Sequence, residues 1–362
     1  MPAKSPDQVR GGIQGKRRSL WPWIPAFAGM TNGDVGRASE YHDAREEGGD
    51  EMTAPDADVL AALKRIPLLA DVAAGALSAE RLGGLTNRNY KITGPEGRYV
   101  LRIPGEKTGD YINRKVEGHN AKAAAAAGVN AEVLFFDTAD GLMLCRFIDG
   151  CLTMSPALFR SRPGAPARAA RALRQMHRSG QGFEFRFELF SMIADYLKLL
   201  AKLGAALPEG YHDVVGEAGK VQAALDRHPA TLAPCHCDPL SENFLDNGER
   251  MWVVDWEYSG MNDPLWDLGD MSVEAGLDEA SDQEMMAAYC EGRVPRALFG
   301  RMVIYKAMCD LLWTLWGLIQ HANKNPVDDF WAYALGRFAR CKTLMASADF
   351  GRHLDAVARN LD

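Results

Sequence analysis

The alternation of apolar and polar positions divides the chain into a short strand-rich part and a long helical part. Apolar runs at 85–92 and 99–103 flank a turn at 94–97, and two more runs follow at 132–136 and 142–147. Runs of this length, bounded by Gly, Pro and Asp, predict the strands of an antiparallel sheet.

Helical periodicity dominates most of the remaining chain. An Ala-rich segment at 113–127 is closed by Gly128, which combines high helix propensity with a helix-ending glycine. Further helices are predicted at 55–65, 165–178, 190–206 and 214–227. We therefore expect an α+β fold, in which a small antiparallel β-sheet with one main helix precedes a larger, mostly helical part.

Residues 1–51 show no persistent period and are rich in Gly, Pro and charged residues, so we expect a disordered N-terminal extension. An apolar island at 20–30 follows the basic run Lys16-Arg17-Arg18. The island is short and broken by prolines, so it is not expected to span a membrane. A signal peptide is the alternative interpretation. The hypothesis we favour is that translation begins at Met52.

Composition and charge narrow the class of partner. The chain has 362 residues, of which 47% are hydrophobic, and a formal net charge of -7. This is a normal balance for a globular protein, and the acidic charge argues against nucleic acid. We expect a small-molecule substrate, no membrane span, and a monomer or homodimer.

The cysteines point to a reducing environment. Their number, seven, is odd and their spacing is irregular, so a disulfide framework is not expected and a cytoplasmic location fits. Cys235-His236-Cys237 resembles part of a metal site. The second ligand pair of a zinc site is missing from the sequence, so we do not expect zinc there.

The most informative stretch is 235–270. Within it, Asn247-Gly248 lies between two apolar runs, and this dipeptide is the strongest short-range signal for a β-hairpin. A hairpin at this point would bring Asn243 alongside Asp255. The sequence therefore predicts that these two polar side chains meet at the open end of the hairpin.

The residue types in this stretch suit phosphoryl transfer from ATP. That reaction needs a carboxylate to orient or deprotonate the attacking hydroxyl, and oxygen ligands for Mg²⁺. Asp238 is the candidate for the first role, and Asn243 and Asp255 are the candidates for the second, because Mg²⁺ prefers hard oxygen donors. His236 completes the catalytic set, and we expect it to hold the loop through its ring nitrogens. His177, on a predicted helix face, is expected to be a core histidine.

The run VVDWEYSGMNDPLWDLGD, together with His236, Asp238 and Asn243, resembles the choline/ethanolamine kinase family of the aminoglycoside phosphotransferase superfamily. The chain is most similar to bacterial choline kinases associated with lipopolysaccharide. The resemblance covers about 77–338 and implies a two-lobed, protein-kinase-like fold. Residues 52–148 would form a nucleotide-binding N-lobe, and 149–362 would form a C-lobe that carries the catalytic and acceptor-binding residues.

The resemblance also implies a nucleotide site in the first lobe. Arg102 would hold phosphate oxygens in place of the Lys of protein kinases, and Glu117 would pair with it. Backbone groups near Phe147 and Ile148 would face the adenine. The nucleotide-binding residues expected from position are Gly84, Asn87, Arg102, Glu117, Phe147 and Ile148.

The acceptor site is inferred from aromatic residues. Trp313 and Trp316 are three residues apart, so they lie side by side on a helix. Tryptophan faces with a tyrosine and a carboxylate hold quaternary ammonium groups through cation–π attraction. By resemblance, the substrate-binding residues are Asp238, Glu257, Tyr258, Glu274, Trp313, Trp316 and Tyr333. One cage tyrosine of the eukaryotic enzymes has no counterpart near 277–279. Asp263 and Asp267 are expected to brace the loop.

The function expected from these residues is phosphorylation of the choline hydroxyl, with ATP and Mg²⁺ as cofactors, to give phosphocholine and ADP. Ethanolamine, thiamine or an aminoglycoside is an alternative acceptor within the kinases. An aminoglycoside site would be lined by several carboxylates, and the tryptophan pair disfavours it. A non-catalytic binding protein with the same fold is the alternative from another class. The presence of Asp238, Asn243 and Asp255 disfavours that alternative.

Overall fold

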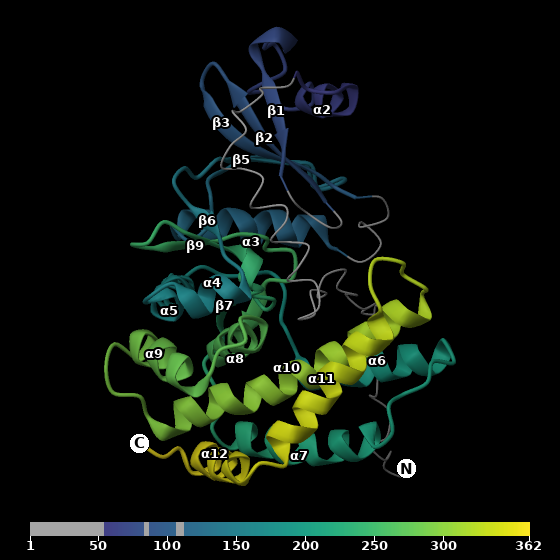
Figure 1. The fold of residues 1–362 in the computed structure, drawn as a ribbon, viewed down its shortest axis with the longest axis vertical. Helices are drawn as coiled ribbons and strands as arrows, with labels where there is room; N and C mark the ends of the chain where they lie inside the picture. The colour runs from purple at the N-terminus through teal and green to yellow at the C-terminus, as the bar shows by residue number, and fades with distance from the viewer. Residues whose placement is uncertain (1–53, 83–86, 106–111) are drawn as a thin grey trace, which may run out of the picture.

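The computed structural model describes residues 54–82, 87–105 and 112–362, and Figure 1 shows a small sheet above a larger helical body. Two separate hydrophobic cores correspond to these parts. The predicted extension at 1–51 and the predicted phosphate-binding Gly84 lie outside the described residues. The α+β class with a small antiparallel sheet and a mostly helical remainder is confirmed.

The small part is a five-stranded antiparallel sheet with the order β1-β2-β3-β5-β4. Its strands are β1 Ser78–Arg81, β2 Arg88–Gly94, β3 Gly97–Ile103, β4 Val133–Phe136 and β5 Met143–Arg146. The predicted turn joins β2 to β3, where Gly94 is opposite Gly97. The core of this part includes Ile92, Leu101 and Leu144, each fully buried. The small part also contains helix α2 Ala57–Leu63 and the 3-10 turn η1 Ala74–Ala76.

Helix α3, Arg114–Ala126, is the predicted Ala-rich helix and runs across the boundary between the two parts. Asn113 caps its N-terminus by accepting from the backbone N–H groups of Lys115 and Val116. The helix lies beside β4, and its Ala121 and Ala124 belong to the larger core. Packing against β4 and against the larger core therefore fixes the position of Glu117 on this helix.

The larger part consists of helices around one long buried helix. Its predicted members at 165–178, 190–206 and 214–227 appear within one to four residues of the expected bounds. The helices of this part are α4 Pro156–Ser161, α5 Ala165–His177, α6 Leu189–Lys202, α7 Tyr211–Arg227, α8 Pro264–Glu274, α9 Glu279–Cys290, α10 Arg296–Ala322, α11 Phe330–Met345 and α12 Ala348–Arg359.

Helix α10 is the central element, and α6, α8, α11 and α12 pack against it. By length and apolar composition it could cross a membrane, which the sequence analysis did not anticipate. However, 94% of its most apolar window is buried inside the protein. Its hydrophobicity is accounted for by its place in the core, with Leu311, Leu315 and Ile319 all fully buried.

The predicted hairpin is present as β8 Phe244–Asp246 and β9 Met251–Val253, joined by a four-residue turn that contains Asn247-Gly248. Two features were missed. The short strand β6 Leu152–Thr153 pairs with β8, and β7 Ala233–Cys235 pairs with β10 Gly260–Asn262. The second pair matters for function, because β7 leads directly into the loop that carries Asp238.

Candidate active site

The loop after β7 positions Asp238 by way of Asp267 on α8. The Asp267 carboxylate accepts the backbone N–H of His236 at 2.7 Å and that of Cys237 at 2.9 Å. Cys237 has a φ of 68°, in the left-handed region that residues other than glycine rarely adopt. The two hydrogen bonds hold that conformation and present Asp238. The prediction that Asp267 braces the loop is confirmed, and so is that for Asp263, which caps α8.

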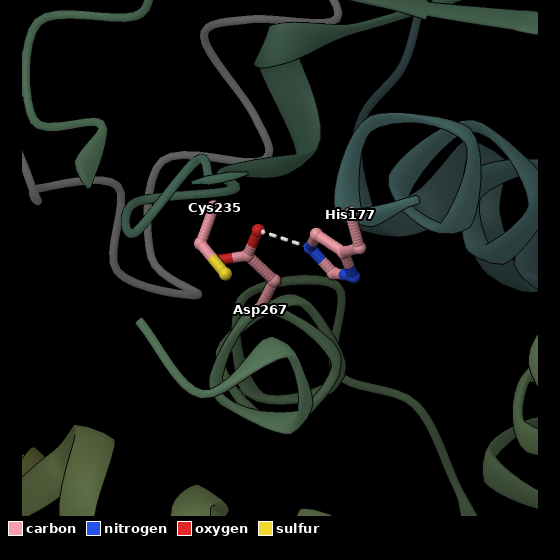
Figure 2. Close-up of side chains that lie close together, drawn as sticks. All are labelled: His177, Cys235 and Asp267. Atoms are coloured by element: carbon pink, nitrogen blue, oxygen red, sulfur yellow. Dashed lines mark hydrogen bonds and ion pairs between the residues drawn. The ribbon is translucent and has the colours of Figure 1, made fainter. Parts of the chain in front are cut away.

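Asp267 is part of a buried group with His177 and Cys235, shown in Figure 2. Their potential ligand atoms lie within 4.8 Å of one another. Each already has a protein partner. His177 bonds Asp267 at 3.0 Å and the Tyr289 hydroxyl at 2.9 Å, and the Cys235 thiol faces the Asn262 carbonyl. Burial raises the pKa of Cys235, which keeps it a thiol. The group is a hydrogen-bonded brace, with His177 in the core as expected.

His236 ties this loop to the hairpin. Its Nε2 lies 2.9 Å from the Val254 carbonyl oxygen, so this nitrogen carries the proton and donates. Burial lowers the pKa of His236 and so keeps the ring neutral, and the ring packs against Trp256 at a centroid distance of 4.8 Å. These contacts match the expected role of holding the loop.

The hairpin brings Asn243 beside Asp255, as predicted. Asn243 ends the 3-10 turn η3 Ser241–Asn243, and its carbonyl accepts the backbone N–H of Val254 at 2.9 Å. The Asn243 side-chain amide donates to the Asp238 carbonyl at 3.1 Å. Asp255 follows Val254 with a left-handed φ of 67°. The three candidate catalytic residues are therefore joined through the backbone of one loop and one hairpin.

Asp255 combines an accessible side chain with a shielded oxygen. The side chain is 39% exposed, yet its Oδ1 is buried and has no hydrogen-bond partner among the described residues. Burial and the charge of Glu257 raise the pKa of Asp255 to about 7, while Arg102, 4.0 Å away, opposes the shift. A carboxylate in this environment is stabilised in its charged form by a nearby cation.

Arg102 lies at the centre of a buried network that we call the Arg102 cluster. Its Nη2 is 2.5 Å from Glu117 and donates to the Gly141 carbonyl at 3.2 Å, while its Nη1 is 3.3 Å from Glu257. The predicted Arg102–Glu117 ion pair is confirmed. Members of the cluster are Asn87, Arg102, Arg114, Glu117 and Glu257.

Glu257 was expected among the acceptor-binding residues, and the structure places it in the Arg102 cluster. One of its oxygens, Oε1, accepts from Asn87 at 3.0 Å, from Arg102 at 3.3 Å and from Arg114 at 2.9 Å. Its side chain thus points toward the sheet rather than toward Trp313. The reason is electrostatic, because Arg102 and Arg114 compensate the buried Glu257 carboxylate there.

The other predicted nucleotide residues lie along the same boundary. Asn87 is buried and accepts the Gly105 N–H at 3.4 Å in addition to its bond with Glu257. Phe147 and Ile148 follow β5, where the chain passes from the sheet to the helical part. The Phe147 N–H donates to the Arg98 carbonyl, so this backbone donor is already used.

The predicted acceptor residues come mainly from three helices. Tyr333 on α11 packs against Trp316 on α10 at a centroid distance of 5.7 Å, because Gly317 has no side chain: a Cβ there would be 2.6 Å from the Tyr333 ring. Trp313 and Trp316 are buried side by side on α10. Glu274 ends α8 and forms an ion pair with Arg337 of α11. Tyr258 is buried in the loop between Asp255 and β10.

Several polar atoms in this region are buried and have no hydrogen-bond partner among the described residues. They are Asp238 Oδ1, Asp270 Oδ2, Trp313 Nε1, Trp316 Nε1 and the Tyr333 hydroxyl. Native proteins rarely leave buried polar atoms unpaired, so such a concentration makes this region a candidate ligand site. We call Asp238, Asp270, Glu274, Cys309, Trp313, Trp316, Tyr333 and Arg337 the acceptor cluster.

Carboxylates give this cluster a negative character. Burial, together with the charges of Asp270, Glu274 and Asp255, raises the pKa of Asp238 well above its usual value. Burial and the charge of Glu274 do the same for Asp270. Carboxyl groups that raise one another's pKa in this way lose protons more readily when a cation binds among them.

Sequence reasoning missed Arg114, Asp270 and Arg337. Each lies three or four positions from a residue that was singled out: Arg114 precedes Glu117 by three, Asp270 precedes Glu274 by four, and Arg337 follows Tyr333 by four. That spacing places a pair on the same face of a helix. A search for charged residues at these offsets would have found all three.

Comparisons with known proteins identify the family of this chain. Residues 79–299 match the model of the phosphotransferase enzyme family (APH). A solved choline/ethanolamine kinase family protein from Mesorhizobium loti is 59% identical, and the match covers 83% of this chain and 98% of that one with a TM-score of 0.77.

Two further relatives are more distant. The choline kinase LicA from Streptococcus pneumoniae is 26% identical, with a TM-score of 0.62 over 74% of this chain and 93% of that one. Protein LicA from Haemophilus influenzae is 28% identical over 267 residues, which is 71% of this chain and 76% of that protein. The chain belongs to the phosphotransferase enzyme family, in which it is a kinase of the choline/ethanolamine type.

Proposed function

We propose that this kinase transfers the terminal phosphoryl group of ATP to the hydroxyl of choline, giving phosphocholine and ADP. The observation that carries the proposal is the acceptor cluster, in which buried carboxylates and unpaired aromatic N–H and O–H groups surround one region next to Asp238. Aromatic faces with carboxylates attract an ammonium group. The choline kinase LicA of S. pneumoniae supports the same acceptor.

In this proposal, Asp238 orients the acceptor hydroxyl and takes its proton as the phosphoryl group is transferred. Burial and the neighbouring carboxylates raise the pKa of Asp238 above its ordinary value, which makes its ionised form a stronger base. Arg102, positioned by Glu117, holds phosphate oxygens with its planar fork. Asn87 and Arg102 both donate to the same oxygen of Glu257, and we assign both residues to the nucleotide site.

The residues at the hairpin fit a magnesium ion. Asp255 Oδ1 has no hydrogen-bond partner among the described residues, and Asn243 uses its amide N–H on the Asp238 carbonyl, which leaves its side-chain oxygen as a potential ligand. Both supply the oxygen ligands that Mg²⁺ prefers. Bound there with ATP, the ion would neutralise charge on the phosphates. The role of this chain is to fix both oxygens through the hairpin.

Among other acceptors, aminoglycosides deserve a direct comparison. Asp238, Asp270 and Glu274 provide the several carboxylates that such an acceptor would need, and the sequence analysis had overlooked Asp270. The aromatic faces of Trp313, Trp316 and Tyr333 favour a compact ammonium group instead. Ethanolamine shares the charge and the hydroxyl of choline and is the closest competitor.

The test is ADP release with Mg-ATP and one acceptor at a time: choline, ethanolamine, thiamine or kanamycin. We expect turnover with choline at the highest kcat/KM, and none with kanamycin. Turnover with kanamycin alone, or ATP-dependent turnover with none of the four acceptors, would overturn the proposal.

A further inference from the structure

Asn120 is a fully buried polar residue of α3, and none of the roles above uses it. It follows Glu117 by three positions, so the two side chains lie on the same face of the helix. Its amide bonds to two segments that are distant in sequence, the turn after Asp255 and the loop between α5 and α6. Buried amides are normally satisfied by hydrogen bonds, so the partners of Asn120 indicate what it holds.

The Asn120 amide uses both of its polar atoms. Its Nδ2 donates to the Ser259 carbonyl at 2.9 Å and to the Ser259 hydroxyl at 3.1 Å. Its Oδ1 accepts the backbone N–H of Glu184 at 3.3 Å. A backbone carbonyl only accepts and a backbone N–H only donates, so these partners fix the orientation of the amide. Asn120 therefore joins α3 to two segments of the larger part.

Ser259 closes the turn that follows Asp255. Its hydroxyl donates to the Trp256 carbonyl at 2.6 Å, and its backbone N–H donates to the same oxygen at 3.3 Å. Asp255 has a left-handed φ of 67°, a conformation that persists only where the surrounding structure fixes it. On the other side of Asp255, the Val254 N–H donates to the Asn243 carbonyl. Contacts on both sides therefore determine where the Asp255 carboxylate lies.

The same helix carries Glu117, which forms the ion pair with Arg102. We propose that Asn120 is a positioning residue, which fixes the turn at 256–259 to α3 and thereby holds the Asp255 carboxylate in place as a ligand for Mg²⁺. This inference rests on the proposed function, in which Asp255 is a metal ligand. Asn120 acts through the turn and not on a substrate.

The test compares Asn120→Ala with the matched control Asn130→Ala. Asn130 is a buried asparagine between α3 and β4, and its Nδ2 donates to the Ala121 carbonyl at 3.1 Å. Both substitutions remove the same side chain, but only the first releases the turn that begins at Asp255. A further variant, Ser259→Ala, removes the hydroxyl and leaves the carbonyl as a partner for Asn120.

Mn²⁺ is the probe, since it takes the same kinds of oxygen ligand as Mg²⁺ and is detected by electron paramagnetic resonance. Its affinity is measured for each protein in complex with ADP. We expect Asn120→Ala to weaken Mn²⁺ binding by about tenfold, as loss of a residue that orients a metal ligand predicts. Asn130→Ala should leave the Mn²⁺ affinity unchanged. The affinity for ADP without metal, measured by calorimetry, should be unchanged in both variants, because Glu117 and Arg102 remain.

Turnover gives a second measurement. The Mg²⁺ concentration for half-maximal turnover with ATP and choline should rise about tenfold in Asn120→Ala and stay at the wild-type value in Asn130→Ala. Ser259→Ala should weaken Mn²⁺ binding by about threefold, because one of the two contacts with Asn120 remains. This variant decides the question if Asn120→Ala does not fold.

Two outcomes overturn this inference alone. One is a Mn²⁺ affinity that stays within about twofold of wild type in Asn120→Ala or, if that variant does not fold, in Ser259→Ala. The other is an equal loss in Asn120→Ala and Asn130→Ala, which would trace the effect to general destabilisation around α3. Absence of Mn²⁺ binding by the wild-type ADP complex would instead contradict the metal site of the proposed function. Absence of turnover with every acceptor would overturn that function and leave the Mn²⁺ comparison measurable.

Discussion

The Arg102 cluster and the acceptor cluster are both buried and both charged, but they differ in how their charges are compensated. In the Arg102 cluster, Glu117 and Glu257 each lie within 3.3 Å of both Arg102 and Arg114. In the acceptor cluster, Asp238 and Asp270 form no ion pair with any residue in the described ranges.

This difference indicates what each region requires from a ligand. Buried charges are stable only when they are paired, and the Arg102 cluster is paired by the fold itself. All four of its described ion pairs join residues of the chain itself. In the acceptor cluster, Arg337 is shared between Glu274 and Asp310, so it forms no ion pair with Asp238 or Asp270. In our proposal, the ammonium group of the acceptor compensates that region.

The largest expected effect comes from Asp238 of the acceptor cluster. Asp238→Asn should lower kcat by about 10²- to 10⁴-fold, because the acceptor hydroxyl loses its base. Nucleotide affinity, measured by calorimetry, should be unchanged, because the Arg102 cluster does not include Asp238. A variant that retains wild-type turnover would refute the role of Asp238 as the base.

The two arginines provide the most direct test of the comparison. Arg102→Lys should raise the KM for ATP by about tenfold and leave the KM for choline unchanged, because a single ammonium cannot replace a fork that contacts Glu117 and Glu257 together. Arg337→Lys should instead raise the KM for choline and leave the KM for ATP unchanged. Steady-state kinetics with each substrate varied in turn would measure both. Parallel changes in both KM values would mean that the two clusters are not independent.

A smaller effect is expected from the aromatic residues. Trp313→Ala should raise the KM for choline about two- to thirtyfold with little change in kcat, as removal of one cation–π contact predicts. Trp331→Ala is the matched control, since this half-buried tryptophan of α11 packs against His321. If both variants raised the KM equally, the effect would be due to packing.

The smallest effect concerns stability and pH. The pKa of Asp270 is raised in the folded protein, so the folded state binds more protons than the unfolded state, and the free energy of unfolding decreases as pH rises above the ordinary aspartate range. Asp270→Asn removes this penalty. Its Tm should exceed that of wild type by a few degrees at pH 8, with a smaller difference at pH 5.5. Thermal melts without ligand would measure this, and an equal difference at both pH values would exclude the proton linkage.

Much of the fold could be predicted from local patterns. The strands at 99–103 and 132–136, the helix at 113–127 and the hairpin around Asn247-Gly248 all depend on residues that are neighbours in sequence, and all are present. The pairing of β7 with β10 was not predictable in this way. It joins Ala233 to Asn262 across the intervening hairpin, and Pro234 in β7 is not typical of a strand.

In the candidate site, too, some features follow from local sequence and others depend on contacts between distant elements. The sequence by itself determined which residue types stand at Asp238, Asn243 and Asp255, and a hairpin with its own turn brings the last two together. Only the tertiary structure decided that Glu257 faces Asn87, 170 positions away, and that Asp270 lies against Cys309 of α10. The physical reason is that buried charges must find partners or remain unpaired through packing between distant elements, and local periodicity carries no record of which elements meet.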